Sequence, residues 1–353
     1  MALTAPDQAR ALVRWMSTTP AGRLANTVRA GDWWDFKLVP ILMLFYASAV
    51  RLDVPIASLW LPLASLLGAL VPGAIYVSLI NDLTDLVEDR AAAKPNRLEG
   101  GGRFRAWAGI AACLAAGGGF ATLWRNDVLL LSLYGGAWLS FTLYSVPPIR
   151  LKVRGFAGLV ADSAGANLFP GVLAAALATR GAGQAQDPIW LASVGCWIFA
   201  YGMRGILWHQ LVDAEADRAA GVGTFVLRHG SRATTILGTG VVLPVELAAL
   251  AWMLWQVAAL APVPALVLYA WLDYARIRWF GLEATLLEPK PREIFIPQEY
   301  YDLFLPLALL AGSALRHPAD FAVVAAQLLL FPRRVVEVFV QLPRLYHRAR
   351  SRK

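Results

Sequence analysis

The fold is decided by the stretch NDLTDLVED at residues 81–89, which follows an uncharged apolar run at residues 54–80. If the helix of that run continues, Asp82, Asp85 and Asp89 stand at i, i+3 and i+7 and share one face. Carboxylates gathered on one face attract cations, and oxygen ligands without Cys or paired His favour Mg²⁺ or a similar ion. The alternative is a solvated acidic helix end, or an N-cap for the next segment.

The composition is that of a membrane protein. Of the 353 residues, 58% are hydrophobic and only 16% are charged, well below the roughly 25% charge of soluble domains. The net charge of +8 and the 14 Trp fit basic cytoplasmic loops and aromatic residues at the membrane interfaces. The basic residues lie in short loops between apolar runs, which argues against a nucleic-acid partner. Cys113 and Cys196 lie in apolar stretches and are expected to pack rather than to form a disulfide.

Nine apolar segments predict an all-α bundle of about nine transmembrane helices. Basic loops follow the second, fourth, sixth and eighth segments, so the positive-inside rule predicts a cytoplasmic N-terminus and cytoplasmic acidic stretches, in the cytoplasmic membrane. Residues 1–37 have the basic and aromatic mixture of an interfacial segment. Residues 318–353 hold a short apolar element and then a basic tail, which is expected to be cytoplasmic or interfacial. Whether the short apolar element forms a tenth span is left open. The nine spans are expected at residues 38–52, 54–80, 106–124, 128–146, 156–179, 188–211, 233–254, 257–273 and 301–316.

A second acidic cluster resembles the first one and follows it four spans later. Asp213 and Asp217 follow the sixth span, and their i, i+4 spacing puts them on one helix face. Each cluster precedes a basic loop that contains glycine, on the same predicted side of the membrane. Two clusters placed in this way are hard to explain as solvated helix ends, because carboxylates near membrane helices are costly and tend to be functional. We therefore expect two half-sites for cations.

Three motifs occur in a recognisable order along the chain. They are Asn81-Asp82-x-x-Asp85-x-x-x-Asp89, Tyr144-Ser145-x-Pro147-Pro148-x-Arg150-x-Lys152 and Asp213-x-x-x-Asp217-Arg218-x-x-Gly221. Together they resemble the UbiA superfamily of intramembrane prenyltransferases. The resemblance implies that residues 38–317 form a bundle around a central cavity with cytoplasmic cap loops. It also implies a Mg²⁺-dependent reaction on an isoprenyl diphosphate. Some members carry an acidic residue just before the third motif, where this chain has Gln210.

The resemblance also implies roles for these residues. An allylic diphosphate departs when its charge is neutralised, which Mg²⁺ ions held by two acidic clusters would achieve. Glu88 falls off the face shared by its neighbours and is left out of the set. The expected metal ligands are Asp82, Asp85, Asp89, Asp213 and Asp217, with Asp82, Asp85, Asp213 and Asp217 also counted as catalytic. The expected substrate-binding residues are Asn81, Lys94, Arg97, Tyr144, Arg150 and Lys152, and the alternative for the basic ones is ordinary positive-inside charge.

Polar residues near or within the apolar spans form another group. Asp162 and Asn167 lie inside the fifth span, where they are expected to act in catalysis and acceptor binding, with interhelical hydrogen bonding as the alternative. Arg204 need not share a face with Asp213, and we expect it to pair with an acidic residue. A lone His209 more often packs or caps than acts as a base. Aromatic residues available to face the cavity and stabilise a cation are Tyr46, Tyr76, Trp138, Phe141, Tyr144 and Trp208.

The leading functional interpretation is transfer of a prenyl group from an isoprenyl diphosphate to an acceptor, most often an aromatic ring in this superfamily. A second interpretation keeps the metals and the ionisation but closes the cation on itself, as in UbiA-type terpene cyclases. A third is a cation transporter, which would spread carboxylates through the depth of the bilayer, whereas here they concentrate at one side. The expected partners are the isoprenyl diphosphate, the lipid bilayer and a small-molecule acceptor, whose identity the sequence does not specify.

Overall fold

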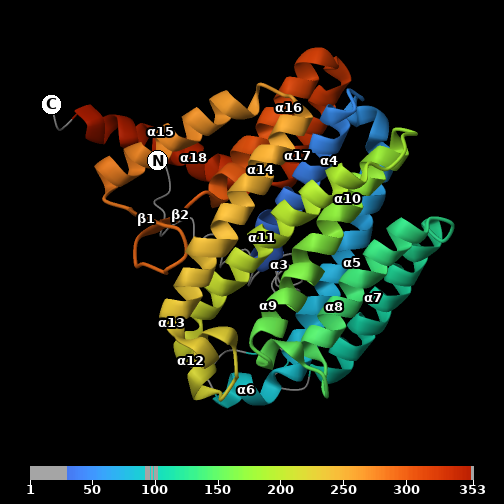
Figure 1. Ribbon diagram of the computed structural model, residues 1–353, viewed down its shortest axis with the longest axis vertical. Coiled ribbons are helices and arrows are strands. Elements are labelled where there is room, and N and C mark those ends of the chain that lie inside the picture. The colour runs from blue at the N-terminus through green and yellow to red at the C-terminus, as the bar shows by residue number, and fades with distance from the viewer. Residues whose placement is uncertain (1–29, 92–95, 97, 99–101, 351–353) are drawn as a thin grey trace.

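The computed structural model describes residues 30–91, 96, 98 and 102–350, and it shows a bundle of helices (Figure 1). The all-α fold predicted from the sequence is confirmed, and each of the nine predicted spans falls on a helix or on a run of joined helices. Within the described part, six of these segments are long and apolar enough to cross a membrane. The predicted interfacial segment lies mostly outside the described residues.

The first half of the chain forms α3 (Ala30–Trp33), η1 (Trp34–Leu38), α4 (Val39–Arg51), η2 (Ile56–Leu59), α5 (Trp60–Thr84), α6 (Leu86–Ala91), α7 (Arg103–Leu123), α8 (Val128–Ser145), η3 (Leu151–Val153), α9 (Phe156–Ser163), η4 (Ala164–Leu168) and α10 (Phe169–Gly181). The second half forms α11 (Pro188–Val212), α12 (Ala214–Ala219), α13 (Phe225–Leu237), η5 (Gly238–Val242), α14 (Leu243–Val257), α15 (Pro262–Phe280), η6 (Tyr300–Phe304), α16 (Leu305–Arg316), η7 (Pro318–Asp320), α17 (Phe321–Leu330) and α18 (Pro332–Arg350).

Helices α4 and α10 form the centre of the bundle, and nearly all of their side chains are buried. They approach closely because small residues line their contact. A Cβ on Gly171 of α10 would come within 2.9 Å of Leu44 on α4 and 3.0 Å of Ile198 on α11. Small residues at such positions let membrane helices pack tightly. The outer helices instead expose large apolar side chains, such as Trp107 of α7 and Trp271 of α15, as contact with lipid requires.

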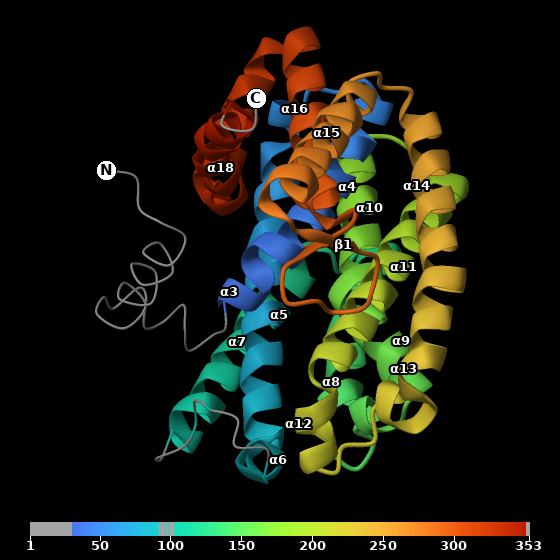
Figure 2. The same cartoon turned by 90° about the vertical axis from the view of Figure 1, so that its left-hand side faces the viewer.

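The two ends of the bundle differ in chemistry. At one end, the short helices α6 and α12, which hold the last residues of the two acidic motifs, lie side by side at the bottom of Figure 1 and Figure 2. At the other end, spans begin at aspartate caps. Asp127 accepts a hydrogen bond from the Leu130 N–H at 3.1 Å, and Asp187 accepts one from the Ile189 N–H at 2.9 Å. These caps satisfy backbone donors that the first turn of a helix leaves without partners.

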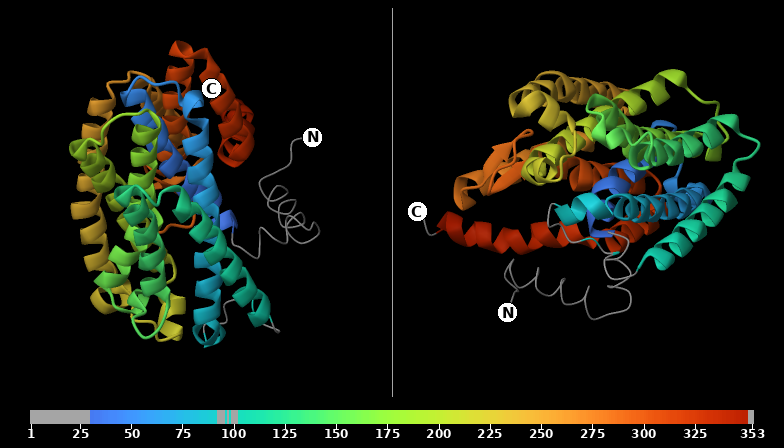
Figure 3. Two further views of the ribbon diagram at one scale, coloured as in Figure 1. Left: turned by 90° about the vertical axis from the view of Figure 1, so that its right-hand side faces the viewer. Right: turned by 90° about the horizontal axis from the view of Figure 1, so that it is seen from below.

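The C-terminal part departs from a simple succession of spans. Between α15 and η6 the chain forms a small parallel pair of strands, β1 (Glu283–Thr285) and β2 (Glu293–Phe295), where the sequence indicated only a basic loop. Helix α17 has 10 residues, about half of what a bilayer-crossing helix needs. The element left open as a tenth span is therefore a short helix. Helix α18 then runs along one side of the bundle (Figure 3).

Candidate active site

A cavity of about 1070 Å³ lies between η1, α5, α8, α9, η4 and α11, and parts of β2 and α18 complete its wall. It brings together all the candidate site residues that the structure describes. These are Asn81, Asp82, Asp85, Asp89, Tyr144, Arg150, Lys152, Asp162, Asn167, Asp213 and Asp217. The remaining two candidates, Lys94 and Arg97, lie outside the described residues.

The first acidic motif is not one continuous helix, which corrects the prediction from its spacing. Helix α5 ends at Thr84, and α6 begins only at Leu86. Asp85 stands at the break, with a backbone conformation outside the helical region (φ −101°, ψ 2°). Asp82 therefore belongs to the last turn of α5, whereas Asp89 belongs to α6. The three carboxylates reach the cavity from two helices and the turn between them, rather than from one helix face.

Asn96 holds this turn in place, a role that the sequence did not indicate. Its side-chain amide donates to the Asp82 carbonyl oxygen at 2.8 Å and to Asp89 Oδ2 at 2.7 Å. Its own Oδ1 accepts from the Leu98 N–H at 2.9 Å. One buried amide thus joins the end of α5 to α6 and to the loop that follows, which positions the acidic motif.

The basic residues of the second motif contact the first motif. Lys152 forms an ion pair with Asp85, and Arg150 places Nη2 at 3.2 Å from the same carboxylate. Arg150 Nη1 also donates to Glu88 Oε1 at 2.5 Å, and this hydrogen bond lowers the pKa of the Glu88 carboxyl. Burial lowers the pKa of Lys152, an effect that Asp85 opposes. Two cations and two carboxylates therefore share one corner of the cavity, which could bind an oxyanion and a cation together.

The second acidic motif is fixed by a neutral side chain at its base. Gln210 is buried in the last part of α11, and its Oε1 accepts from the N–H of Phe225 at 3.0 Å and of Val226 at 3.4 Å. This contact ties α11 to the start of α13 and closes the loop that carries Asp213 and Asp217. A glutamate could accept the same two hydrogen bonds, but the glutamine does so without adding a negative charge.

The donor set of the two acidic motifs consists of oxygen atoms, which suits Mg²⁺. Within the residues that the structure describes, no three His, Cys, Asp or Glu side chains come together closely enough to hold a metal ion by themselves. This arrangement agrees with the usual coordination of Mg²⁺ at phosphate sites, where one or two carboxylates act together with phosphate oxygens and water. Oxygen donors of this kind fit Mg²⁺ that is bound together with phosphate oxygens.

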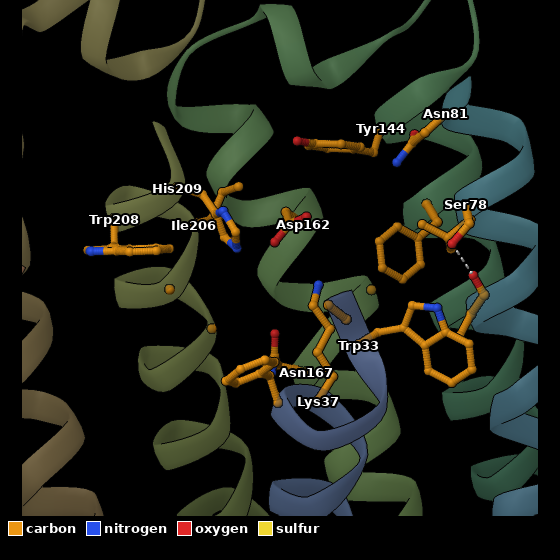
Figure 4. Close-up of a pocket in the computed structure, with 18 of the residues that line it drawn as sticks. Trp33, Lys37, Ser78, Asn81, Tyr144, Asp162, Asn167, Ile206, Trp208 and His209 are labelled. Atoms are coloured by element: carbon orange, nitrogen blue, oxygen red, sulfur yellow. Dashed lines mark hydrogen bonds between the residues drawn. The ribbon is translucent and has the colours of Figure 1, made fainter. Parts of the chain in front are cut away.

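Aromatic residues also line the cavity, with isolated polar groups among them (Figure 4). Tyr76 and Trp138 pack with ring centroids 4.9 Å apart. Five of the six aromatic residues proposed from the sequence line the cavity, namely Tyr76, Trp138, Phe141, Tyr144 and Trp208. Tyr46 does not, because its side chain is buried in the core and donates to Gln327 at 2.9 Å. The sequence missed Trp33, Phe36 and Phe295, whose place on the wall depends on long-range packing.

Asp162, Asn167 and His209 all reach this interior, from α9, η4 and α11 (Figure 4). Asn167 depends on a glycine opposite it, since a Cβ on Gly202 would come within 2.7 Å of Asn167 Oδ1. Lys37, which the sequence placed in the interfacial segment, also extends into the cavity. No local pattern distinguishes Lys37 from the other basic residues near the N-terminus.

Arg204 pairs with an acidic residue, as expected, and this pair connects helices instead of facing the cavity. Its guanidinium donates to both oxygens of Glu246, at 2.7 and 2.9 Å, and to the Ile296 carbonyl oxygen at 3.1 Å. The side chains of this pair are 1% and 0% exposed. The pair joins α11 to α14 and to the segment after β2, outside the cavity lining.

A model of the UbiA prenyltransferase family matches residues 38–282, more than half of the chain. The chain belongs to the UbiA prenyltransferase family. Together with the six apolar helices, this membership makes it an integral, multi-pass membrane protein. The family match ends before β1, so β1, β2 and the helices from η6 to α18 lie beyond it.

Two curated plant proteins are similar to this UbiA-family chain. A probable homogentisate phytyltransferase 2, chloroplastic, of Oryza sativa subsp. japonica is 29% identical over 198 residues, 54% of this chain and 52% of the relative. A 2-acylphloroglucinol 4-prenyltransferase, chloroplastic, of Humulus lupulus is 34% identical over 122 residues, 34% of this chain and 29% of the relative. The match thus spans about half of the first relative's length and less of the second.

Solved structures of a UbiA homolog from Archaeoglobus fulgidus share the fold. The structure bound to DMAPP and Mg²⁺ has a TM-score of 0.55 at 18% identity, covering 82% of this chain and 98% of the homolog. The structure bound to GPP and Mg²⁺ has a TM-score of 0.53 at 18% identity, covering 85% of this chain and 99% of the homolog. At this identity the likeness concerns the fold.

Proposed function

We propose that this UbiA-family chain is a Mg²⁺-dependent prenyltransferase that moves a prenyl group from an isoprenyl diphosphate to an aromatic acceptor. One observation carries the proposal: two acidic motifs, from α5–α6 and α11–α12, line one cavity whose interior is aromatic. The names of the plant relatives and the prenyl diphosphates bound by the Archaeoglobus homolog support it.

The acidic motifs form the diphosphate end of the cavity. The proposed metal ligands are Asp82, Asp85, Asp89, Asp213 and Asp217, with Asn81 as a neutral oxygen ligand or hydrogen-bond donor. When bound by these residues, Mg²⁺ would supply positive charge that offsets the charge of the leaving diphosphate. Arg150 and Lys152 lie beside Asp85, where they contribute positive charge for the same oxygens. Lys94 and Arg97, which lie outside the described residues, are further candidates.

The interior of the cavity serves the reacting carbon. The allylic C–O bond breaks and the diphosphate leaves with its electron pair, so a cation must be shielded from water. The faces of Tyr76, Trp138 and Tyr144 exclude water and stabilise positive charge. A ring carbon of the acceptor then forms the new C–C bond, and the proton that this carbon loses passes to the Asp162 carboxylate. Asn167 orients the acceptor through its amide.

The proposed orientation places the acidic end in the cytoplasm. The basic loops flank the acidic motifs, whereas the opposite end carries the aspartate caps, which agrees with the positive-inside rule for a cytoplasmic membrane. Residues 38–317 would form the catalytic domain, with an interfacial segment before it and an interfacial or cytoplasmic tail after it. Cysteines introduced singly at Glu215 and at Ala182 test this: a membrane-impermeant thiol reagent should label the second, not the first, from outside intact cells.

Product analysis tests the reaction itself. Purified protein is incubated with Mg²⁺ and geranyl, farnesyl or geranylgeranyl diphosphate, with and without homogentisate or a 2-acylphloroglucinol, and products are identified by mass. A prenylated acceptor is the expected result. A cyclic hydrocarbon or terpene alcohol formed equally well without an acceptor would identify a cyclase instead.

A further inference from the structure

The Asn96 side chain lies behind the first acidic motif rather than on the cavity wall. Asn96 is only 6% exposed, and among the described residues it does not line the cavity, whereas Asp82 and Asp89 do. Its amide contacts both of them, through the Asp82 carbonyl oxygen at 2.8 Å and Asp89 Oδ2 at 2.7 Å. Any effect of Asn96 on an ion in the cavity must therefore pass through these contacts.

Three hydrogen bonds fix which way the Asn96 amide points. Both groups next to Nδ2 are oxygen acceptors, whereas the group next to Oδ1 is the Leu98 N–H, which can only donate. The opposite orientation would set the amide oxygen against two oxygens and the amide nitrogen against an N–H. The side chain therefore gives both of its donors to the acidic motif, and its oxygen is used by Leu98.

The hydrogen bond to Asp82 explains how the break in the motif is held. Helix α5 ends at Thr84, and Asp85 has a backbone conformation outside the helical region. Carbonyl groups in the last turn of a helix lack the donors that a continuing helix would supply, and Asn96 supplies a donor to the one on Asp82. Asn96 thus stabilises the turn from which Asp82 and Asp89 reach the same cavity.

The hydrogen bond to Asp89 restrains a carboxylate directly. Because Oδ2 accepts from the Asn96 amide, rotation of the carboxylate would leave a buried donor without a partner, which costs free energy. We propose that Asn96 is a positioning residue that holds Asp89 in the orientation for Mg²⁺ and so sets the affinity of the first motif for the ion. The inference rests on the proposed function, in which Asp89 is a metal ligand.

The chemistry of the amide makes the proposal specific. An ionised aspartate at position 96 would have nearly the same shape as asparagine but no hydrogen-bond donor. Its negative charge would also face the Asp89 carboxylate. Two carboxylates that close repel each other, so the Asp89 side chain would leave the position that it now holds. Asn96→Asp therefore removes the restraint while it preserves the volume of the side chain.

The test compares Asn96→Asp and Asn96→Ala with wild-type protein, all as the full chain in detergent. Asn126→Asp and Asn126→Ala are the matched controls, because Asn126 is exposed in the turn between α7 and α8. The probe is Mn²⁺, whose binding is measured by electron paramagnetic resonance in the presence of a non-reactive thiolo analogue of geranyl diphosphate. Diphosphate release from geranyl diphosphate is measured in parallel over a range of Mg²⁺ concentrations.

We expect N96D and N96A to bind Mn²⁺ about tenfold to a hundredfold more weakly than wild type, the usual effect of removing a group that hydrogen-bonds to a metal ligand. The Mg²⁺ concentration for half-maximal release should rise by the same factor. At saturating Mg²⁺ the kcat should return close to the wild-type value, which also shows that the variants are folded. Both Asn126 variants should match wild type. In an Asp89→Asn background, Asn96→Ala should cause little further loss, because the carboxylate that it positions is gone.

The inference would be overturned if N96D bound Mn²⁺ as tightly as wild type, or if its loss of kcat persisted at saturating Mg²⁺, as expected of a residue that only supports the fold. Equal losses on Asn96→Ala with and without Asp89→Asn would also overturn it, since Asn96 would then act without Asp89. Failure of the proposed function is distinguishable, because wild-type protein would then bind no Mn²⁺ with the analogue and release no diphosphate from geranyl diphosphate.

Discussion

At the scale of single residues, the site depends on positions where one side chain leaves room for another. Gly202 and Gly205 both belong to α11 and both line the cavity. A Cβ on Gly202 would meet Asn167 Oδ1 at 2.7 Å, whereas a Cβ on Gly205 would have nothing within 4 Å. Substituting Gly202 therefore tests whether Asn167 needs the space, and substituting Gly205 is a control for adding a methyl group elsewhere on the cavity wall.

Gly202→Ala should displace Asn167 and reduce kcat/KM for the acceptor by about tenfold to a hundredfold, because small displacements of positioning groups are costly in catalysis. Gly205→Ala should stay close to wild type. Equal activity of the two variants, measured by prenylated product, would show that Asn167 has no positioning role.

Lys152 should make the binding of a diphosphate dependent on pH. Because burial lowers its pKa, Lys152 loses its charge at a lower pH than a free lysine does. The affinity for a non-reactive thiolo analogue of geranyl diphosphate should therefore fall as pH rises into the alkaline range, since deprotonation removes positive charge. Lys152→Arg should bind with little change over that range, because the guanidinium stays protonated. Parallel titration curves for the two proteins would assign the pH dependence to another group.

The Arg204–Glu246 pair predicts a loss of stability rather than of chemistry. Removing one partner leaves a buried charge without compensation, so Arg204→Met should lower the unfolding free energy by about 3–5 kcal/mol. The double variant Arg204→Met with Glu246→Leu should recover much of that loss, since no charge stays buried. Unfolding in detergent measures both, and a double variant less stable than the single one would contradict this interpretation.

At the scale of elements, α18 separates the cavity from the lipid, with its polar face toward the cavity and its apolar face outward. Arg334, Glu337 and Gln341 line the cavity, whereas Val336 and Phe339 are exposed on the outside. Arg334 also approaches Asp302 of η6 at 3.7 Å. The helix therefore connects η6 with η1 across one side of the cavity.

Arg334→Ala should loosen this wall and admit water to the allylic cation. The expected outcome is a several-fold rise in the ratio of prenyl alcohol to prenylated acceptor, whereas Val336→Ala on the outer face should leave the ratio unchanged. The ratio is read by mass spectrometry of the products, and an unchanged ratio in R334A would mean that α18 does not exclude water.

The elements were predictable where local composition decides them. A helix in lipid must satisfy its own backbone and needs about 20 apolar residues, so the nine spans could be located from apolar runs. The break at Asp85 could not, because no Gly or Pro marks it and its contacts come from Asn96 and Arg150. The positions of Lys37 and α18 could not be predicted either, because they depend on contacts between distant parts of the chain. For example, Trp34 Nε1 donates to the Leu330 carbonyl oxygen at 2.8 Å, although the two residues are 296 positions apart in the sequence.

At the scale of the whole molecule, the bundle brings residues from both halves of the chain to one cavity. The candidate residues could be named from the sequence because the motifs carry a family resemblance, and eleven of them prove to line the cavity. Their grouping into two facing motifs depends on the packing of α5 and α11 around the core of α4 and α10. The fold thus brings the two acidic motifs to the wall of one cavity whose lining also includes aromatic residues.

The central claim is that both acidic motifs act together on an isoprenyl diphosphate. The most direct measurement is Mg²⁺-dependent release of diphosphate from geranyl diphosphate by wild type, Asp82→Ala, Asp213→Ala and the control Glu215→Ala, which lies between Asp213 and Asp217 but off the cavity wall. We predict that either aspartate variant, or removal of Mg²⁺, lowers release by at least about a hundredfold, whereas E215A retains it. Full release by D82A or D213A, or by wild type without divalent cation, would contradict the claim.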